Sequence, residues 1–65
     1  MRVSLFRSSF ARDLLCAVRS GTKVPDFLKE AGWQLLGTRE AERVPALIPA
    51  RVKALGQVGH VIYRR

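Results

Sequence analysis

Residues 1–19 read MRVSLFRSSFARDLLCAVR, and this stretch decides the fold that the sequence predicts for the 65-residue chain. It holds four arginines and one acidic residue, Asp13. Its apolar side chains recur every three or four residues, which is the spacing of one face of an amphipathic helix. These side chains are Val3, Phe6, Phe10, Leu14 and Ala17. We therefore expect residues 1–20 to form an amphipathic, arginine-rich helix.

An apolar stripe with several arginines and almost no acid is typical of a presequence for mitochondrial import. The segment is accordingly predicted to be a targeting helix, either cleaved or retained. The protein would then lie in the mitochondrial matrix or on the matrix face of the inner membrane. Two alternatives remain open: the helix packs on the chain's own core, or it lies on a membrane surface with Phe6 and Phe10 inserted.

The middle of the chain contains a second candidate helix. Pro25 and Asp26 favour a helix that begins near Val24 and continues to Leu36, because proline and an acid are both accepted in a first turn. In the alternative, Gly32 ends this helix and the residues that follow begin a short strand.

The last third of the chain is divided by prolines. A residue before proline is pushed towards extended geometry, so the segment before Pro49 is expected to be an extended connector. Pro49 then opens a short helix that continues to Leu55, and Gly56 ends it. The tail Val58–Tyr63 is β-prone and is expected to add as an edge strand to another structure.

Together these elements predict a mainly α chain of two or three short helices joined by extended proline-containing segments. A chain of this length buries only about 60% of its unfolded surface, so little independent core is expected. Cys16 is the only cysteine and His60 the only histidine, which excludes an internal disulfide and a four-ligand Cys/His metal site. Residues 21–65 are therefore interpreted as a small helical and extended segment that binds to a larger assembly.

The charge balance favours a polyanionic partner. Twelve Lys and Arg residues against five Asp and Glu residues give a net charge of +7. RNA and an anionic membrane surface both attract such a chain, and arginine pairs with phosphate more effectively than lysine does. The residues predicted to bind RNA or anionic lipid are Arg7, Arg12, Arg19, Arg51, Lys53, Arg64 and Arg65.

Large apolar and aromatic side chains are predicted to anchor the chain on a partner. Such residues carry much of the binding energy of an interface, and a tryptophan next to glycine in an apolar segment is interpreted as an anchor. The predicted anchors are Phe6, Phe10, Leu14, Phe27, Trp33 and Tyr63. Tyr63 is also a candidate for stacking on a base beside the C-terminal arginines.

No catalytic or metal motif is evident. Cys16 lies near arginines that would lower its pKa, yet a lone cysteine on an apolar segment is more typical of packing. His60 has no orienting acid or nucleophile that the sequence identifies. We predict no catalytic residue, no metal and no cofactor, and no apolar run approaches the roughly 18 residues of a transmembrane helix.

Two short segments resemble HicA-type toxins, a family of small mRNA-cleaving proteins with a double-stranded-RNA-binding fold. LKEAGWQLL at residues 28–36 is similar to the helix-to-strand entry of that family, and GHVIYRR at residues 59–65 is similar to the strand that carries its catalytic histidine. The resemblance implies that His60 is catalytic. The family joins these elements almost directly, whereas here twenty-two residues separate them.

Three functions follow from these observations. The leading one is a non-catalytic accessory subunit of a large mitochondrial assembly, above all a mitochondrial ribosomal protein that contacts rRNA and neighbouring proteins. The second is a peripheral subunit of a respiratory-chain complex or ATP synthase, in which the basic residues contact anionic membrane lipid. The third is a small HicA-like toxin that acts on RNA.

Overall fold

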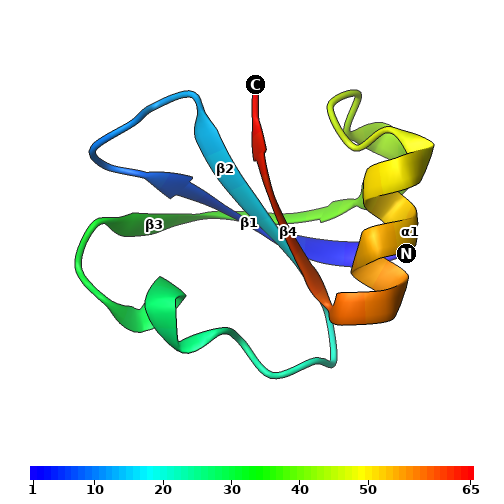
Figure 1. The fold of residues 1–65 in the computed structure, drawn as a ribbon, viewed down its shortest axis with the longest axis horizontal. Coiled ribbons are helices and arrows are strands. Elements are labelled where there is room, and N and C mark those ends of the chain that lie inside the picture. Colours follow the sequence, from blue (N-terminus) through cyan, green and yellow to red (C-terminus); the bar gives the residue numbers. More distant parts are fainter.

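A computed structural model describes residues 1–65 and shows a four-stranded antiparallel sheet with one α-helix (Figure 1). The strand order is β3-β1-β2-β4, so β3 and β4 are the edges of the sheet. The elements are β1 (Arg2–Ser8), β2 (Leu14–Arg19), the 3₁₀ helix η1 (Asp26–Lys29), β3 (Trp33–Glu40), the 3₁₀ helix η2 (Ala41–Arg43), α1 (Pro49–Val58) and β4 (His60–Arg64). The prediction of a mainly α chain is therefore wrong.

The helix predicted for residues 1–20 is replaced by an antiparallel hairpin. β1 and β2 pair with Leu5 opposite Ala17 and Phe6 opposite Cys16. Four consecutive residues of β2, Leu15–Val18, are buried, because both faces of the sheet are covered. The sequence of a strand that is buried on both faces is a continuous apolar run without alternation. Hydrophobic periodicity does not distinguish such a run from a buried helix.

The helix predicted from Val24 to Leu36 is also wrong. Only η1 is helical in this segment, and Gly32 adopts φ +108°, a left-handed conformation that glycine tolerates and a helix interior does not contain. Trp33 then begins β3, as the alternative interpretation of Gly32 had predicted. The conformation of Gly32 is therefore incompatible with a helix that continues to Leu36.

The C-terminal third agrees better with expectation. The helix begins at Pro49 as predicted, but it continues past Gly56 to Val58. Gly59 ends it with φ 97°, and its backbone N–H donates to the carbonyl of Leu55. The predicted edge strand is β4, which pairs with β2 of the same chain.

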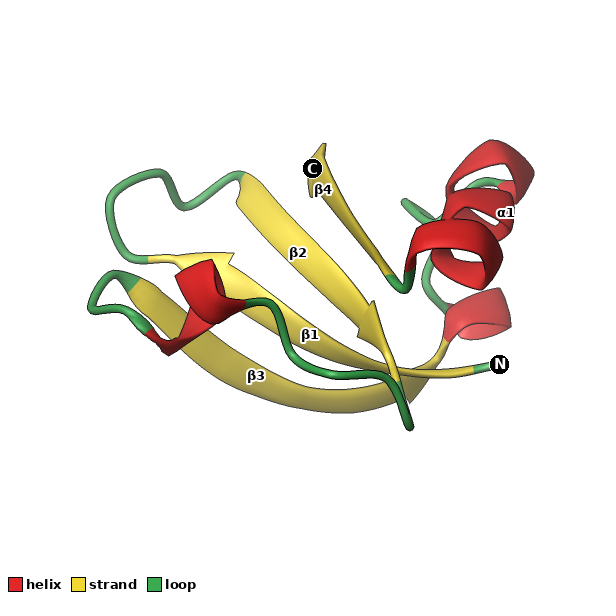
Figure 2. Cartoon of the chain, turned by 60° about the horizontal axis from the view of Figure 1, so that its bottom comes forward, coloured by secondary structure: helices red, strands yellow, loops and turns green.

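Apolar clusters cover both faces of the sheet, so the expectation of little independent core is wrong. Consecutive strand residues point to opposite faces, and on β1 Leu5 belongs to one cluster while Phe6 packs against the other. The first cluster lies under α1, where Leu55 is fully buried. The second lies under the η1 segment, which crosses the other face (Figure 2).

Candidate functional site

One end of the sheet brings together arginines from both ends of the chain. Arg7 lies near the end of β1, Arg12 in the hairpin that joins β1 to β2, and the C-terminal pair Arg64–Arg65 at the end of β4. Arg7 pairs with Leu15, which pairs in turn with Tyr63, so β4 ends two strands away from Arg7. We call Arg7, Arg12, Arg64 and Arg65 the basic end. In Figure 1 the C-terminus and the β1–β2 hairpin both lie away from the N-terminus.

One arginine of the basic end is paired with an acid, Asp13. Arg64 Nη1 donates to Asp13 Oδ2 at 2.8 Å, and the Arg65 backbone N–H donates to the Asp13 carbonyl at 2.8 Å. The hydrogen bond from Arg64 lowers the pKa of the Asp13 carboxyl. Arg7, Arg12 and Arg65 form no ion pair. Three of the four arginines at this end therefore have no carboxylate partner within the chain.

The β1–β2 hairpin at this end of the sheet also exposes an aromatic ring. Phe10 in the β1–β2 hairpin is 88% exposed. The backbone N–H groups of Phe10 and Ala11 both donate to Ser8 Oγ at 3.1 Å, which orders the loop. The ring lies against Gly32, where an added Cβ would come within 2.6 Å of a ring carbon. The hairpin thus presents the ring at the surface in a constrained position.

The remaining cations predicted to bind a polyanion lie elsewhere. Arg19 donates to the Gly56 carbonyl at 3.2 Å and so ties β2 to α1. Arg51 donates to the Ala46 carbonyl at 2.6 Å. Lys53 is exposed on α1. Of the seven residues predicted to bind RNA or anionic lipid, the structure therefore places four at the basic end.

Most of the predicted partner anchors pack inside the chain. Phe27 and Trp33 form an edge-to-face pair with ring centroids 5.8 Å apart, and Phe6 packs in the same cluster. Tyr63 is 4% exposed in the first cluster, and Leu14 is half-buried. Phe10 is the exception because it is exposed in the β1–β2 hairpin. The sequence predicts a helix at this position and not a hairpin. The only signal for that hairpin was the cluster of serines after Arg7, a composition typical of turns.

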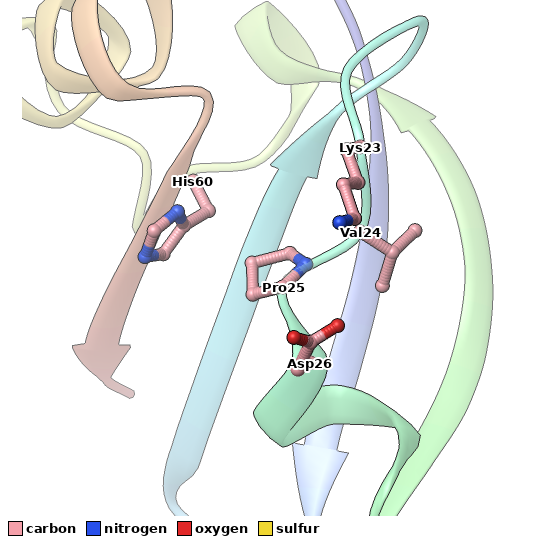
Figure 3. A pocket seen from close by; sticks show the side chains of 5 residues that line it. All are labelled: Lys23, Val24, Pro25, Asp26 and His60. Carbon is pink, nitrogen blue, oxygen red and sulfur yellow. The ribbon is translucent and has the colours of Figure 1, made fainter.

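His60 lies at a shallow, open pocket of about 270 Å³ that Lys23, Val24, Pro25 and Asp26 also line (Figure 3). In this view Pro25 lies between the imidazole and the Asp26 carboxylate, and no hydrogen bond joins the two side chains. The imidazole instead packs edge-to-face on Phe27 at 5.8 Å. No acid–base pair is therefore assembled at His60.

Cys16 is fully buried, and burial raises the pKa of its thiol to about 11. The nearby arginines that the sequence places around it do not offset this desolvation, so the thiol stays protonated at neutral pH. No cluster of three or more His, Cys, Asp or Glu side chains is arranged to hold a metal ion.

Comparison of the chain with protein-family models, curated proteins and solved structures finds no significant match. The segment GHVIYRR does form a strand, β4, as the resemblance to HicA-type toxins implies. The other segment, LKEAGWQLL, runs from η1 into β3 rather than from an α-helix. None of the helices reaches the length and apolar character that crossing a bilayer requires.

Proposed function

We propose that the chain is a non-catalytic module that binds single-stranded RNA through the basic end, as a small component of a ribonucleoprotein assembly. The observation that carries this proposal is that Arg7, Arg12 and Arg65, which have no carboxylate partner, lie at the end of the sheet where the β1–β2 hairpin exposes the ring of Phe10. The mitochondrial ribosome as that assembly, and a mitochondrial location, remain predictions. They were based on composition and on a targeting helix at residues 1–20, which the β1–β2 hairpin replaces.

The chemistry of the basic end suits RNA in two ways. Guanidinium groups donate paired hydrogen bonds to phosphate oxygens, which supplies affinity without sequence preference. An exposed aromatic ring stacks on a base, and this requires a base that is not already stacked in a duplex. Cations and an aromatic ring at one end of the sheet therefore favour a single strand over a double helix.

Fluorescence anisotropy with a labelled ten-nucleotide RNA tests the proposal. Three phosphate contacts predict that the logarithm of the association constant falls with the logarithm of salt concentration with a slope of about −2. Arg12→Gln should make this slope less steep by about 0.7, the contribution of one contact. Arg43→Gln is the matched control, because Arg43 is also exposed and unpaired but lies in η2, after the opposite end of β3.

Phe10→Ala tests the stacking contribution separately. Loss of one base–aromatic stack should weaken binding by about 1–3 kcal/mol, which corresponds to roughly five- to 150-fold. The stability of the chain should change little, because the ring is 88% exposed.

Three results would overturn the proposal. The first is equal RNA affinity for the wild type, Arg12→Gln and Phe10→Ala. The second is binding to vesicles of anionic phospholipid without binding to RNA, which would support the membrane-associated alternative. The third is cleavage of the RNA by the purified chain that His60→Ala abolishes, which would support the toxin-like alternative.

A further inference from the structure

An aromatic ring, a side-chain amide and a guanidinium occupy neighbouring positions where the β1–β2 hairpin meets β3. The ring of Phe10 lies against Gly32, and the Ser9 backbone N–H donates to the Gly32 carbonyl at 2.7 Å. This hydrogen bond continues the β1–β3 pairing past its last residue pair, Ser8 with Trp33. The hairpin and the beginning of β3 are therefore joined at one end of the sheet (Figure 2).

Gln34 follows Gly32 by two positions and lies directly opposite Arg7 in the β1–β3 pairing. Residues opposite each other in an antiparallel pair share a face, with Cβ atoms about 4.5–5.5 Å apart. Two residues of extended chain span about 7 Å. The Gln34 amide therefore lies between the Phe10 ring along the strand and the Arg7 guanidinium on the next strand.

The fold does not use either of these polar side chains. Gln34 is exposed, and its amide forms no hydrogen bond within the chain. β3 is an edge of the sheet, so no further strand lies beyond Gln34. Arg7 is half-buried, and its guanidinium likewise forms no hydrogen bond or ion pair. Both groups can therefore bind a ligand without breaking a polar contact of the fold.

We propose that Gln34 contacts the base edge of a bound nucleotide and gives the RNA site a preference for adenine. This inference rests on the proposed RNA binding and adds base selection to it. A glutamine amide carries a carbonyl acceptor beside an NH₂ donor. Adenine presents the complementary pair, the N6 amino donor and the N7 acceptor, and glutamine pairs with both. Adenine also has a larger ring system than the pyrimidines, which increases its contact with the Phe10 ring.

The three side chains have different effects on binding. Arg7 donates to phosphate oxygens, which are the same in every nucleotide, so it supplies affinity without base preference. Phe10 stacks on any base, because every base has a π face. Gln34 alone among the three offers both a hydrogen-bond donor and an acceptor, so the choice between bases depends on it.

Fluorescence anisotropy with ten-nucleotide strands of oligoadenylate, oligocytidylate and oligouridylate tests the inference. A paired contact between an amide and adenine discriminates by about five- to 150-fold. Because Gln34 is exposed and water competes there, the wild type should prefer oligoadenylate by about five- to tenfold. Gln34→Ala should reduce this preference to about twofold or less. It should leave the salt dependence of binding unchanged, because glutamine carries no charge.

Gln34→Glu tests the hydrogen-bonding chemistry more sharply. A carboxylate accepts hydrogen bonds and donates none, and it pairs with the N4 amino group of cytosine. All strands should bind more weakly because a negative charge then lies opposite Arg7, but the ratio of adenine to cytosine affinity should fall to about one or below. Gln57→Ala is the matched control, because Gln57 is exposed on α1, outside the basic end, and should leave the ratio unchanged.

The inference is overturned if the wild type binds the three strands equally, or if Gln34→Ala keeps the preference for oligoadenylate, which would assign it to stacking on Phe10 alone. An equal loss of preference in Gln57→Ala would overturn it as well. These outcomes leave the proposed RNA binding intact, because the arginine contacts do not depend on the base. Failure of the wild type to bind any of the strands would contradict the proposed function itself, and this inference with it.

Discussion

Leu55 provides the sharpest test of the fold. Its side chain is fully buried between α1 and the sheet. Leu55→Ala removes three carbon atoms, which costs about 2 kcal/mol of transfer free energy at 0.8 kcal/mol per buried methylene group. The cavity left behind adds to this loss, and we expect a total of about 3 kcal/mol.

The total stability of a chain of this size is about 3–10 kcal/mol, so Leu55→Ala removes a large share of it. The melting temperature should fall by about 12–24 °C, at 4–8 °C per kcal/mol. Leu55→Val removes a single methylene-sized group and should cost about 1 kcal/mol, which remains measurable if the alanine variant does not fold. Val58→Ala on the same helix is the control, because Val58 is 67% exposed and should change stability by less than about 0.5 kcal/mol.

Urea unfolding followed by circular dichroism and by Trp33 fluorescence measures these effects. Trp33 packs in the cluster on the opposite face, so both signals should shift together if the two clusters unfold cooperatively. Equal, small losses for the Leu55 and Val58 variants would refute the packing of α1 on the sheet. A shift in circular dichroism alone would refute the cooperation of the two faces.

Three further predictions concern single residues. Gly59→Ala should lower the free energy of unfolding by about 1–2 kcal/mol because Gly59 has φ +97°, whereas Gly56→Ala inside α1 should raise it by about 1 kcal/mol, both measured by urea unfolding. Cys16 should react with iodoacetamide at pH 8 at least about a hundredfold more slowly in the folded chain than in urea, because its pKa rises from 9.0 to about 11 and its side chain is fully buried; equal rates would contradict its burial. The lowered pKa of Asp13 means that its pairing with Arg64 stabilises the fold above the ordinary value of 3.8 and is lost as pH falls through the lowered pKa. The urea midpoint of the wild type should therefore fall more steeply than that of Asp13→Asn between pH 5 and pH 2, and parallel curves would contradict the pairing.

The helix that begins at Pro49 was predictable because its signal is local. Proline at the first helical position is pre-organised for a helix, whatever packs on that helix. The β-prone tail was predictable for the same reason, although its partner, β2, was not. The net charge of +7 also follows from the residue counts without a structure.

The hairpin at residues 2–19 was not predictable by the same means. Its apolar residues satisfy a helical spacing, yet the chain gains more by pairing β1 with β2 and covering both faces of the sheet. The covering side chains, such as Leu55 on α1 and Leu28 in η1, come from distant parts of the chain. Periodicity within one segment contains no information about them.

Composition alone therefore determined that the chain is basic, and local signals located one helix and one strand. Only the tertiary structure decided that Arg7 and Arg65 lie at one end of a sheet, that Phe10 is exposed in the hairpin at that end, and that the Tyr63 hydroxyl is buried without a partner. The physical reason is that strand pairing joins residues that lie up to some fifty positions apart, and the burial free energy that selects this pairing belongs to the whole fold.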